Sequence, residues 1–223
     1  MEWIGFFLAF VVFFLTHSVP VRPPVRPALV RRLGPRGFTM AYSALSLAVL
    51  AWLIVAAARA PYVPLWPWAI WQNHAALALM CAACVIVGLA IGRPNPFSFG
   101  GARNELFDTG RPGIVRLTRH PLLIALALWS GAHLLANGDL AHLLLFGTFG
   151  VFAVMGTRLV DRRKRSDLGP AWADLWGEVT RVHRTDAIRT ILSEEKGRVL
   201  AGLVLFAGLF LLHPVVIGVN PLP

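Results

Sequence analysis

Charge is scarce in this sequence, and acidic residues are the rarest charged group. Only 14% of the residues are charged, with 11 Asp and Glu against 21 Lys and Arg, while 57% are hydrophobic. Mean hydropathy is +0.65. A soluble domain of 223 residues cannot hide so much apolar surface. The composition therefore excludes an ordinary soluble protein and predicts that lipid surrounds most of the chain.

Cysteine is also scarce, and the two residues present lie together inside an apolar stretch. Cys81 and Cys84 cannot build the framework of a disulfide-rich secreted domain. Val85 follows the pair, where a covalent haem-attachment motif would place histidine. A thioredoxin-type pair stands at an exposed helix start. Because this pair lies in the middle of an apolar run, small packing residues are the favoured interpretation.

Long apolar runs, by contrast, are abundant. A helix needs about 20 mostly apolar residues to span the hydrocarbon core. The first run lacks the basic region and cleavage site of a secretory signal, so we interpret it as a retained helix. We predict an all-α membrane protein, a bundle of about six transmembrane helices in a single domain over residues 1–223. The predicted helices lie near residues 3–19, 38–59, 69–92, 121–136, 140–157 and 199–219.

The fourth and fifth predicted helices are short and are joined by Asn137, Gly138 and Asp139. Glycine permits a turn, and aspartate can cap the helix that follows. We therefore expect these two helices to be antiparallel neighbours.

The basic residues follow membrane sidedness. Three connections, after the first, third and fifth predicted helices, hold every lysine and arginine except Arg59. The positive-inside rule places these connections in the cytoplasm. We therefore predict a bacterial inner-membrane protein with both termini periplasmic. Nucleic-acid binding is disfavoured, because it would need the arginines gathered on one folded module.

The cytoplasmic segment 158–198 carries an amphipathic pattern. Apolar residues such as Trp172, Leu175, Trp176 and Val179 recur at helical spacing, with charged residues on the opposite face. We predict interfacial helices in the headgroup region, whose basic residues bind anionic lipid.

The histidines fall into two layers, and an imidazole within hydrocarbon is costly enough to suggest a function. Haem iron takes one or two axial nitrogen ligands from facing helices, so the layer away from the arginines could supply a pair for haem b. The alternative is that these rings only hydrogen-bond between helices. The layers are His17 and His120 on the basic side, and His74, His133, His142 and His213 on the other.

The tripeptide Arg119-His120-Pro121 predicts a helix start, since proline suits the first helical position. With Arg116 nearby, the free backbone donors could seat a carboxylate or phosphate of a cofactor or lipid. An ordinary basic helix start is the alternative. On the same helix, Trp129 and His133 are four residues apart, so the indole could stack beside a flat ligand or pack between helices.

Three motifs in this order resemble the NnrU family, and the resemblance covers nearly the whole chain. It implies an association with denitrification and nitrogen-oxide metabolism. The motifs are Asn95-Pro96-Phe97-Ser98-Phe99-Gly100, Thr118-Arg119-His120-Pro121-Leu122-Leu123, and Trp129 to His133 with the residues that follow to Leu140.

The architecture is also similar to 15-cis-zeta-carotene isomerase, a membrane haem b protein. This resemblance implies isomerisation of a lipophilic polyene and histidine ligands at His17 and His133, with Ser130 at the position of the isomerase's cysteine. Our assignment of depth places His17 and His133 at opposite membrane faces. His74 or His213 is therefore an alternative partner for His133.

A more distant resemblance is to membrane methyltransferases of the isoprenylcysteine type, which bind S-adenosylmethionine. Arg119-His120-Pro121 and the segment from Asp161 to Trp172 match their two motifs. Leu123 and Ala125 replace the tyrosine and glycine of the first motif, so two cofactor contacts are missing. Methyl transfer is therefore an alternative to the haem hypothesis, as is a non-catalytic membrane accessory protein.

Overall fold

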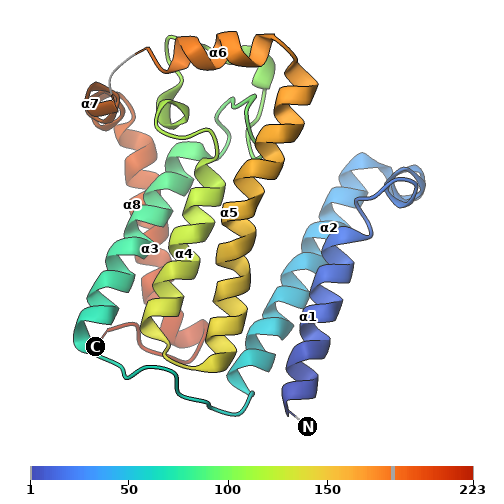
Figure 1. The fold of residues 1–223 in the computed structure, drawn as a ribbon, viewed down its shortest axis with the longest axis vertical. Coiled ribbons are helices and arrows are strands. Elements are labelled where there is room, and N and C mark those ends of the chain that lie inside the picture. The colour runs from blue at the N-terminus through green and yellow to red at the C-terminus, as the bar shows by residue number, and fades with distance from the viewer. Residues whose placement is uncertain (1, 182–183, 223) are drawn as a thin grey trace. The chain divides into compact units, whose positions relative to one another are not determined.

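The chain folds into helices joined by loops. The computed structural model describes residues 2–181 and 184–222, and within these ranges its regular secondary structure is entirely helical (Figure 1). The all-α prediction is therefore confirmed. The helices are α1 (Glu2–Ser18), α2 (Val25–Ala58), α3 (Ile70–Ala90), η1 (Asn104–Leu106), η2 (Gly113–Arg116), α4 (Pro121–Ala136), α5 (Leu140–Leu168), α6 (Ala171–Val179), α7 (Arg184–Glu194) and α8 (Lys196–Val216), where η marks a 3₁₀ turn.

Several helices have the length and composition of membrane spans. In the described part of the chain, α2, α3, α5 and α8 are long and apolar enough to cross a bilayer. Helices α1 and α4 are apolar but have only 17 and 16 residues. At about 1.5 Å per residue, about 16 residues reach roughly 24 Å, less than a hydrocarbon core of about 30 Å. The membrane character is thus supported, whereas the count of six spans stays a prediction.

The chain divides into two compact units. The first comprises Met1–Leu65 with Asp139–Leu145, and the second comprises Trp66–Gly138 with Phe146–Pro223. Each is described by itself below. The expectation of a single domain stays a prediction.

In the first unit, α1 packs along α2. Helix α2 begins at Val25, well before the expected start at Phe38, and a kink divides it. At the kink, Gly34 has φ 72° and ψ 164°, a conformation that favours glycine, and Pro35 follows it. The arginine-rich connection after the first helix is therefore partly helical.

In the second unit, α3 packs against both α4 and α8. The backbones of α3 and α8 are nearly in contact, because a Cβ at Gly88 would lie 2.5 Å from the carbonyl oxygen of Arg198. A Cβ at Gly202 would likewise lie 2.5 Å from the Cα of Val85. Small residues permit such close approach between membrane helices. Cys84 is a buried free thiol beside this contact, as expected of a packing residue.

The connection between α4 and α5 is as tight as its sequence predicts. The Asp139 carboxylate caps α5, accepting from the backbone N–H groups of Ala141 at 3.0 Å and His142 at 3.2 Å. Gly138 has a different role from the one expected. It is not among the glycines with positive φ, but a Cβ there would collide with the Trp66 carbonyl. The glycine is required for close approach.

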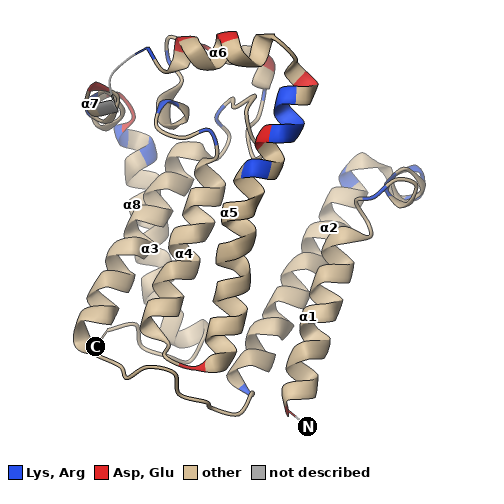
Figure 2. Cartoon of the chain, viewed as in Figure 1, with Lys and Arg blue, Asp and Glu red and all other residues tan. Residues whose placement is uncertain are grey.

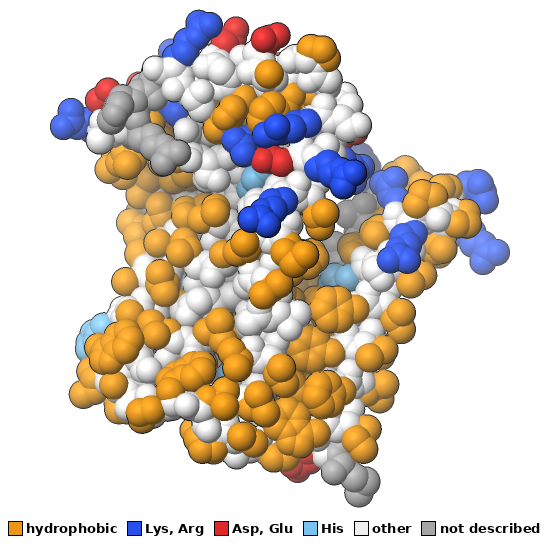
Figure 3. All heavy atoms as spheres, in the orientation of Figure 1, with side chains coloured by type: hydrophobic (Ala, Val, Ile, Leu, Met, Phe, Trp, Pro, Cys, Tyr) orange, Lys and Arg blue, Asp and Glu red, His pale blue; other side chains and the backbone are white. Residues whose placement is uncertain are grey.

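Charge is concentrated at one end of the second unit. Figure 2 shows lysine and arginine gathered around α6, α7 and the loops between α3 and α4. We call this end, where α4 and α8 begin, the basic end. The opposite end, where α3 begins and α4 and α8 finish, is the far end. In the space-filling view of Figure 3, hydrophobic side chains cover much of the visible surface away from the basic end.

The apolar faces of α6 and α7 pack on protein. Trp172 and Val179 of α6 are buried against Phe97 and Val115 of the loop between α3 and α4. Ile191 of α7 packs with the last residues of α3. An apolar face was predicted for these helices, and here the chain itself covers part of it. Their placement in the lipid headgroups stays a prediction.

Candidate functional site

His120 is held at the basic end by the start of α4. It is the residue before the helix, and Pro121 occupies the first helical position, as predicted. The backbone N–H of His120 donates to the Thr118 hydroxyl at 3.2 Å. The side chain is only 4% exposed, so its ring nitrogens need partners within the protein.

Those partners are a serine and an aspartate. His120 Nδ1 lies 3.0 Å from the Ser98 hydroxyl, and Nε2 lies 2.8 Å from the Asp161 carboxylate. Burial lowers the pKa of His120, although the Asp161 carboxylate opposes this shift. We assign the neutral ring, in which Nε2–H donates to Asp161 and Nδ1 accepts from Ser98.

Arg119 binds the same carboxylate. Its Nε and Nη2 donate to the two Asp161 oxygens at 2.9 and 2.7 Å, a bidentate pair. Its guanidinium also lies over the rings of Trp176 and Trp172, at 4.6 and 5.4 Å from their centroids. Two donors of Arg119 are thus occupied by the chain's own carboxylate. An external anion at this arginine would have to compete with Asp161.

Asn95 connects this cluster to the preceding loop. Its side-chain amide donates to the Arg119 carbonyl at 2.9 Å, and its side-chain oxygen accepts from the Phe97 backbone at 3.1 Å. Phe97 is fully buried, edge-on to Trp172 and Trp176. We call Asn95, Ser98, Arg119, His120 and Asp161 the basic-end cluster.

Arg116 does not join this cluster. Its Nη2 donates to the Gly110 carbonyl at 3.3 Å, and the side chain lines a cavity with Arg93 and Arg111. Arg116 and Arg119 were expected to flank a single anion-binding site. In the structure, the two side chains have different partners.

At the far end, His133 is held by its own helix. Its Nδ1–H donates to the Trp129 carbonyl at 2.9 Å. Its ring stacks on Phe146, with centroids 4.6 Å apart, and lies 5.1 Å from Trp129. Trp129 also packs edge-on against Phe146 and Phe149, so its indole belongs to the contact between α4 and α5.

The other far-end histidines of this unit use the same kind of bond. His74 Nδ1 lies 3.1 Å from the Ile70 carbonyl one turn earlier, and His213 Nδ1 lies 2.7 Å from the Val219 carbonyl just after α8. Because α3 packs against α4 and α8, these histidines share one end of the unit with His133. The pairing of any two of them as ligands stays a prediction.

His17 belongs to the first unit. Its Nδ1 lies 2.8 Å from the Phe13 carbonyl, and its ring stacks on Phe13 with centroids 4.0 Å apart. The Tyr42 hydroxyl donates to the His17 carbonyl at 3.1 Å. The pair of His17 with His133 therefore involves two separate units and stays a prediction.

Across residues 2–181 and 184–222, no group of three or more His, Cys, Asp or Glu is arranged to hold a metal ion. A haem needs fewer protein ligands, one or two axial nitrogens.

The sequence analysis assigned no role to Ser98 or Asp161. Asp161 precedes a run of four basic residues in α5, a pattern typical of a solvated charged segment. Its position beside His120 depends on packing between segments 41 residues apart. The only signal for Ser98 was a hydroxyl between the two phenylalanines Phe97 and Phe99.

These observations define an all-helical protein with several apolar helices of membrane-spanning length and a buried polar cluster at its basic end. A family model described as NnrU protein matches residues 5–221. The chain belongs to the NnrU family. Comparisons with curated proteins and with solved structures found no match.

Proposed function

We propose that this NnrU-family chain is a membrane haem b protein in which His133 supplies one axial ligand. The observation that carries the proposal is the bond from His133 Nδ1 to the Trp129 carbonyl at 2.9 Å. That bond fixes the tautomer, so that Nε2 carries the lone pair. Histidines that ligate metals are commonly oriented by such a bond from their other nitrogen.

The surrounding residues support the choice of His133. Its ring lies between the aromatic side chains of Trp129 on α4 and Phe146 on α5. One turn earlier, Ser130 is fully buried, and its hydroxyl has no hydrogen-bond partner among the described residues. A buried polar atom without a hydrogen-bond partner is uncommon in a native protein core. A bound group beside α4 would give it one.

The second ligand is a histidine from the same end, His74 or His213, or His17 as the isomerase resemblance implies. In each of the three, Nδ1 lies within 3.1 Å of a backbone carbonyl, which leaves Nε2 as the nitrogen with the lone pair. A haem held by these histidines would supply Lewis acidity or the capacity to bind a small ligand. The chain's own residues hold the imidazoles and keep the site apolar, which suits a small gas or a lipophilic polyene such as a carotene.

The test is absorbance spectroscopy of the full chain, purified in detergent from haem-replete cells. We expect a Soret band that His133→Ala abolishes and that His142→Ala leaves in place. Single alanine variants of His74, His213 and His17 then identify the second ligand by a shifted or weakened band.

A colourless, folded protein would sink this proposal and favour a non-catalytic accessory protein. Methyl transfer instead predicts binding of S-adenosylmethionine that Arg119→Gln abolishes. The basic-end geometry does not favour it, because Asp161 already occupies Arg119.

The proposal includes a location. We place the chain in the bacterial inner membrane, in the setting of nitrogen-oxide metabolism, with its basic end in the cytoplasm and both termini in the periplasm. The support is the gathering of lysine and arginine at one end of the second unit (Figure 2). Labelling of single cysteines introduced at exposed positions 162 and 220 by a membrane-impermeant reagent in intact cells should modify only the second.

A further inference from the structure

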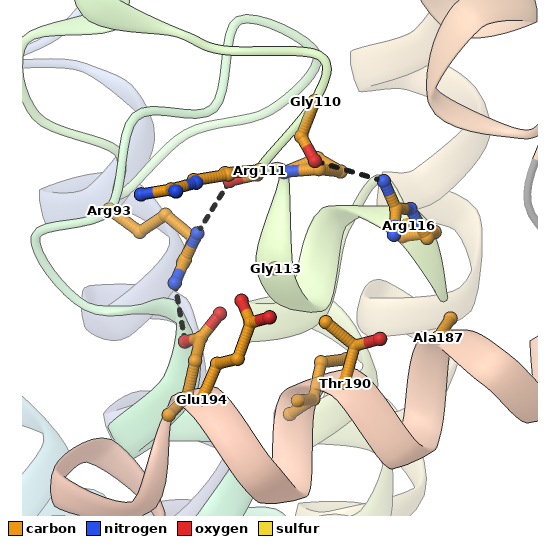
Figure 4. Close-up of a pocket in the computed structure, with 11 residues that line it drawn as sticks. Arg93, Gly110, Arg111, Gly113, Arg116, Ala187, Thr190 and Glu194 are labelled. Carbon is orange, nitrogen blue, oxygen red and sulfur yellow. Dashed lines mark hydrogen bonds and ion pairs between the residues drawn. The ribbon is translucent and has the colours of Figure 1, made fainter.

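A cavity of about 330 Å³ opens at the basic end, between the loop before α4 and helix α7. Figure 4 shows Arg93, Arg111 and Arg116 on the side of the loop and of η2, with Thr190 and Glu194 of α7 on the other. The basic-end cluster contributes none of the residues that line it. The cavity is thus separate from both sites described above.

Two of the three arginines that line this cavity, Arg93 and Arg116, are held in place by bonds to the chain. Arg93 forms an ion pair with Glu195, and its Nη1 donates to the Arg111 carbonyl at 3.2 Å. Arg116 donates to the Gly110 carbonyl at 3.3 Å. These bonds fix two guanidinium groups before any ligand arrives, which lowers the entropic cost of binding.

Some of their donors remain unused. The Nε atoms of Arg93 and Arg116 are buried and have no hydrogen-bond partner among the described residues. Among the described residues, no ion pair neutralises Arg111 or Arg116. Of the two carboxylates at the cavity, Glu195 is paired with Arg93. Three arginines thus line the cavity with two glutamates, and this excess of positive charge favours an anion.

We infer that this cavity between η2 and α7 binds a phosphate group through the guanidinium groups of Arg93, Arg111 and Arg116 that line it. Guanidinium groups recognise phosphate oxygens with paired N–H donors. The cavity also lies just beyond Ala90, where the apolar helix α3 ends, which is the level of headgroups if α3 spans the bilayer. The phosphate belongs either to a lipid headgroup or to a soluble phosphorylated compound.

The experiment uses the full chain, purified in detergent and stripped of lipid, in calorimetric titrations. The probes are dioctanoyl phosphatidic acid, inorganic pyrophosphate, and dioctanoylglycerol, which has the same acyl chains without phosphate. We expect at least one phosphate probe to bind and dioctanoylglycerol not to bind. Phosphatidic acid alone identifies a lipid headgroup, and pyrophosphate binding identifies a soluble ligand.

Matched variants locate the binding. Arg111→Gln and Arg116→Gln should each raise the Kd about tenfold, the loss of one charge-assisted contact. Arg162→Gln removes the same charge from an exposed site on α5 and should leave the Kd within about twofold. The Arg111 side chain is exposed, so its variant should fold even if Arg116→Gln does not.

The inference is overturned if neither phosphate probe binds, or if dioctanoylglycerol binds as well as phosphatidic acid. It is equally overturned if Arg162→Gln weakens binding as much as Arg111→Gln does, because general electrostatic attraction would then suffice. None of these outcomes bears on haem binding at the far end.

Discussion

The two ends of the second unit hold their histidines by different groups. At the basic end, His120 is fixed on both nitrogens by side chains from other segments, Ser98 and Asp161. At the far end, the Nδ1 atoms of His74 and His133 bond to carbonyls of their own helices. A ring bonded at both nitrogens to other segments ties those segments together, whereas a ring bonded through Nδ1 to its own helix does not.

This comparison assigns the two ends different roles. The basic-end cluster joins the loop after α3, the start of α4 and the charged extension of α5, so its main contribution is to stability. The far end, where we propose the haem site, lies apart from this polar network. Substitutions at the basic end should therefore cost stability, while those at the far end should cost ligand binding.

The largest effect is expected from Asp161→Asn. This change leaves Arg119 without its counter-charge and weakens the bond to His120. Loss of one partner from a largely buried pair costs about 3 kcal/mol. Unfolding of the purified protein in denaturing detergent measures it, with exposed Asp174→Asn on α6 as the control. Equal stability of the two variants would refute the role of the cluster.

A smaller loss is expected from Gly88→Ala, near the basic end of α3. The added Cβ would meet the Arg198 carbonyl and the backbone of Gly202 at 2.5 and 2.7 Å, and neither can move independently of its helix. Overpacking of this kind costs about 2 kcal/mol. Gly208→Ala on α8 is the matched control, since its Cβ would meet nothing within 4 Å. A thermal shift comparison of the two variants checks this, and similar melting temperatures would contradict it.

Local features of this architecture could be predicted from sequence. The helix start at Arg119-His120-Pro121 was predicted correctly, because proline at the first helical position is a signal contained within one turn. The range 121–136 for α4 was also right, because hydropathy is a local property. Helix α5 was expected to end near residue 157 but continues to Leu168, since its charged last turns carry no hydropathy signal.

Contacts between distant segments could not be predicted in the same way. The extension of α5 is what brings Asp161 to His120, so the error in its end concealed the cluster. The amphipathic pattern of α6 predicts an apolar face but does not identify the residues that cover it. In the structure, Phe97 and Val115 cover part of this face. The two units also divide His17 from His133, which a list of motifs does not reveal.

The pH dependence of stability distinguishes His120 from the far-end histidines. Burial lowers the pKa of His120 in the folded protein, so the unfolded chain takes up a proton first as the pH falls. The stability contributed by the neutral ring is fully present above about pH 6.5, the unfolded pKa, and is lost as pH falls toward the folded pKa. Between about pH 7.5 and 5.5, we expect the wild type to lose about 1 kcal/mol more than His120→Gln.

The control for this measurement is His74→Gln, which removes an exposed histidine on α3. It shows how far the removal of a histidine elsewhere in the chain changes the pH dependence. If His120→Gln and wild type lose stability in parallel, His120 is not the titrating group and the neutral-ring assignment is wrong.

The smallest effects come from two serines that sit toward opposite ends of the unit. The Ser98 hydroxyl bonds to His120 at 3.0 Å, so Ser98→Ala leaves a buried ring nitrogen without a partner and should destabilise by about 1 kcal/mol. The Ser130 hydroxyl has no partner among the described residues, so Ser130→Ala in the haem-free protein should be neutral or stabilising by up to about 1 kcal/mol. Both changes remove one oxygen from a buried serine, which makes each the control for the other in the same unfolding assay. If Ser130→Ala destabilises as much as Ser98→Ala, the far end contains a polar network of its own, and the contrast between the two ends fails.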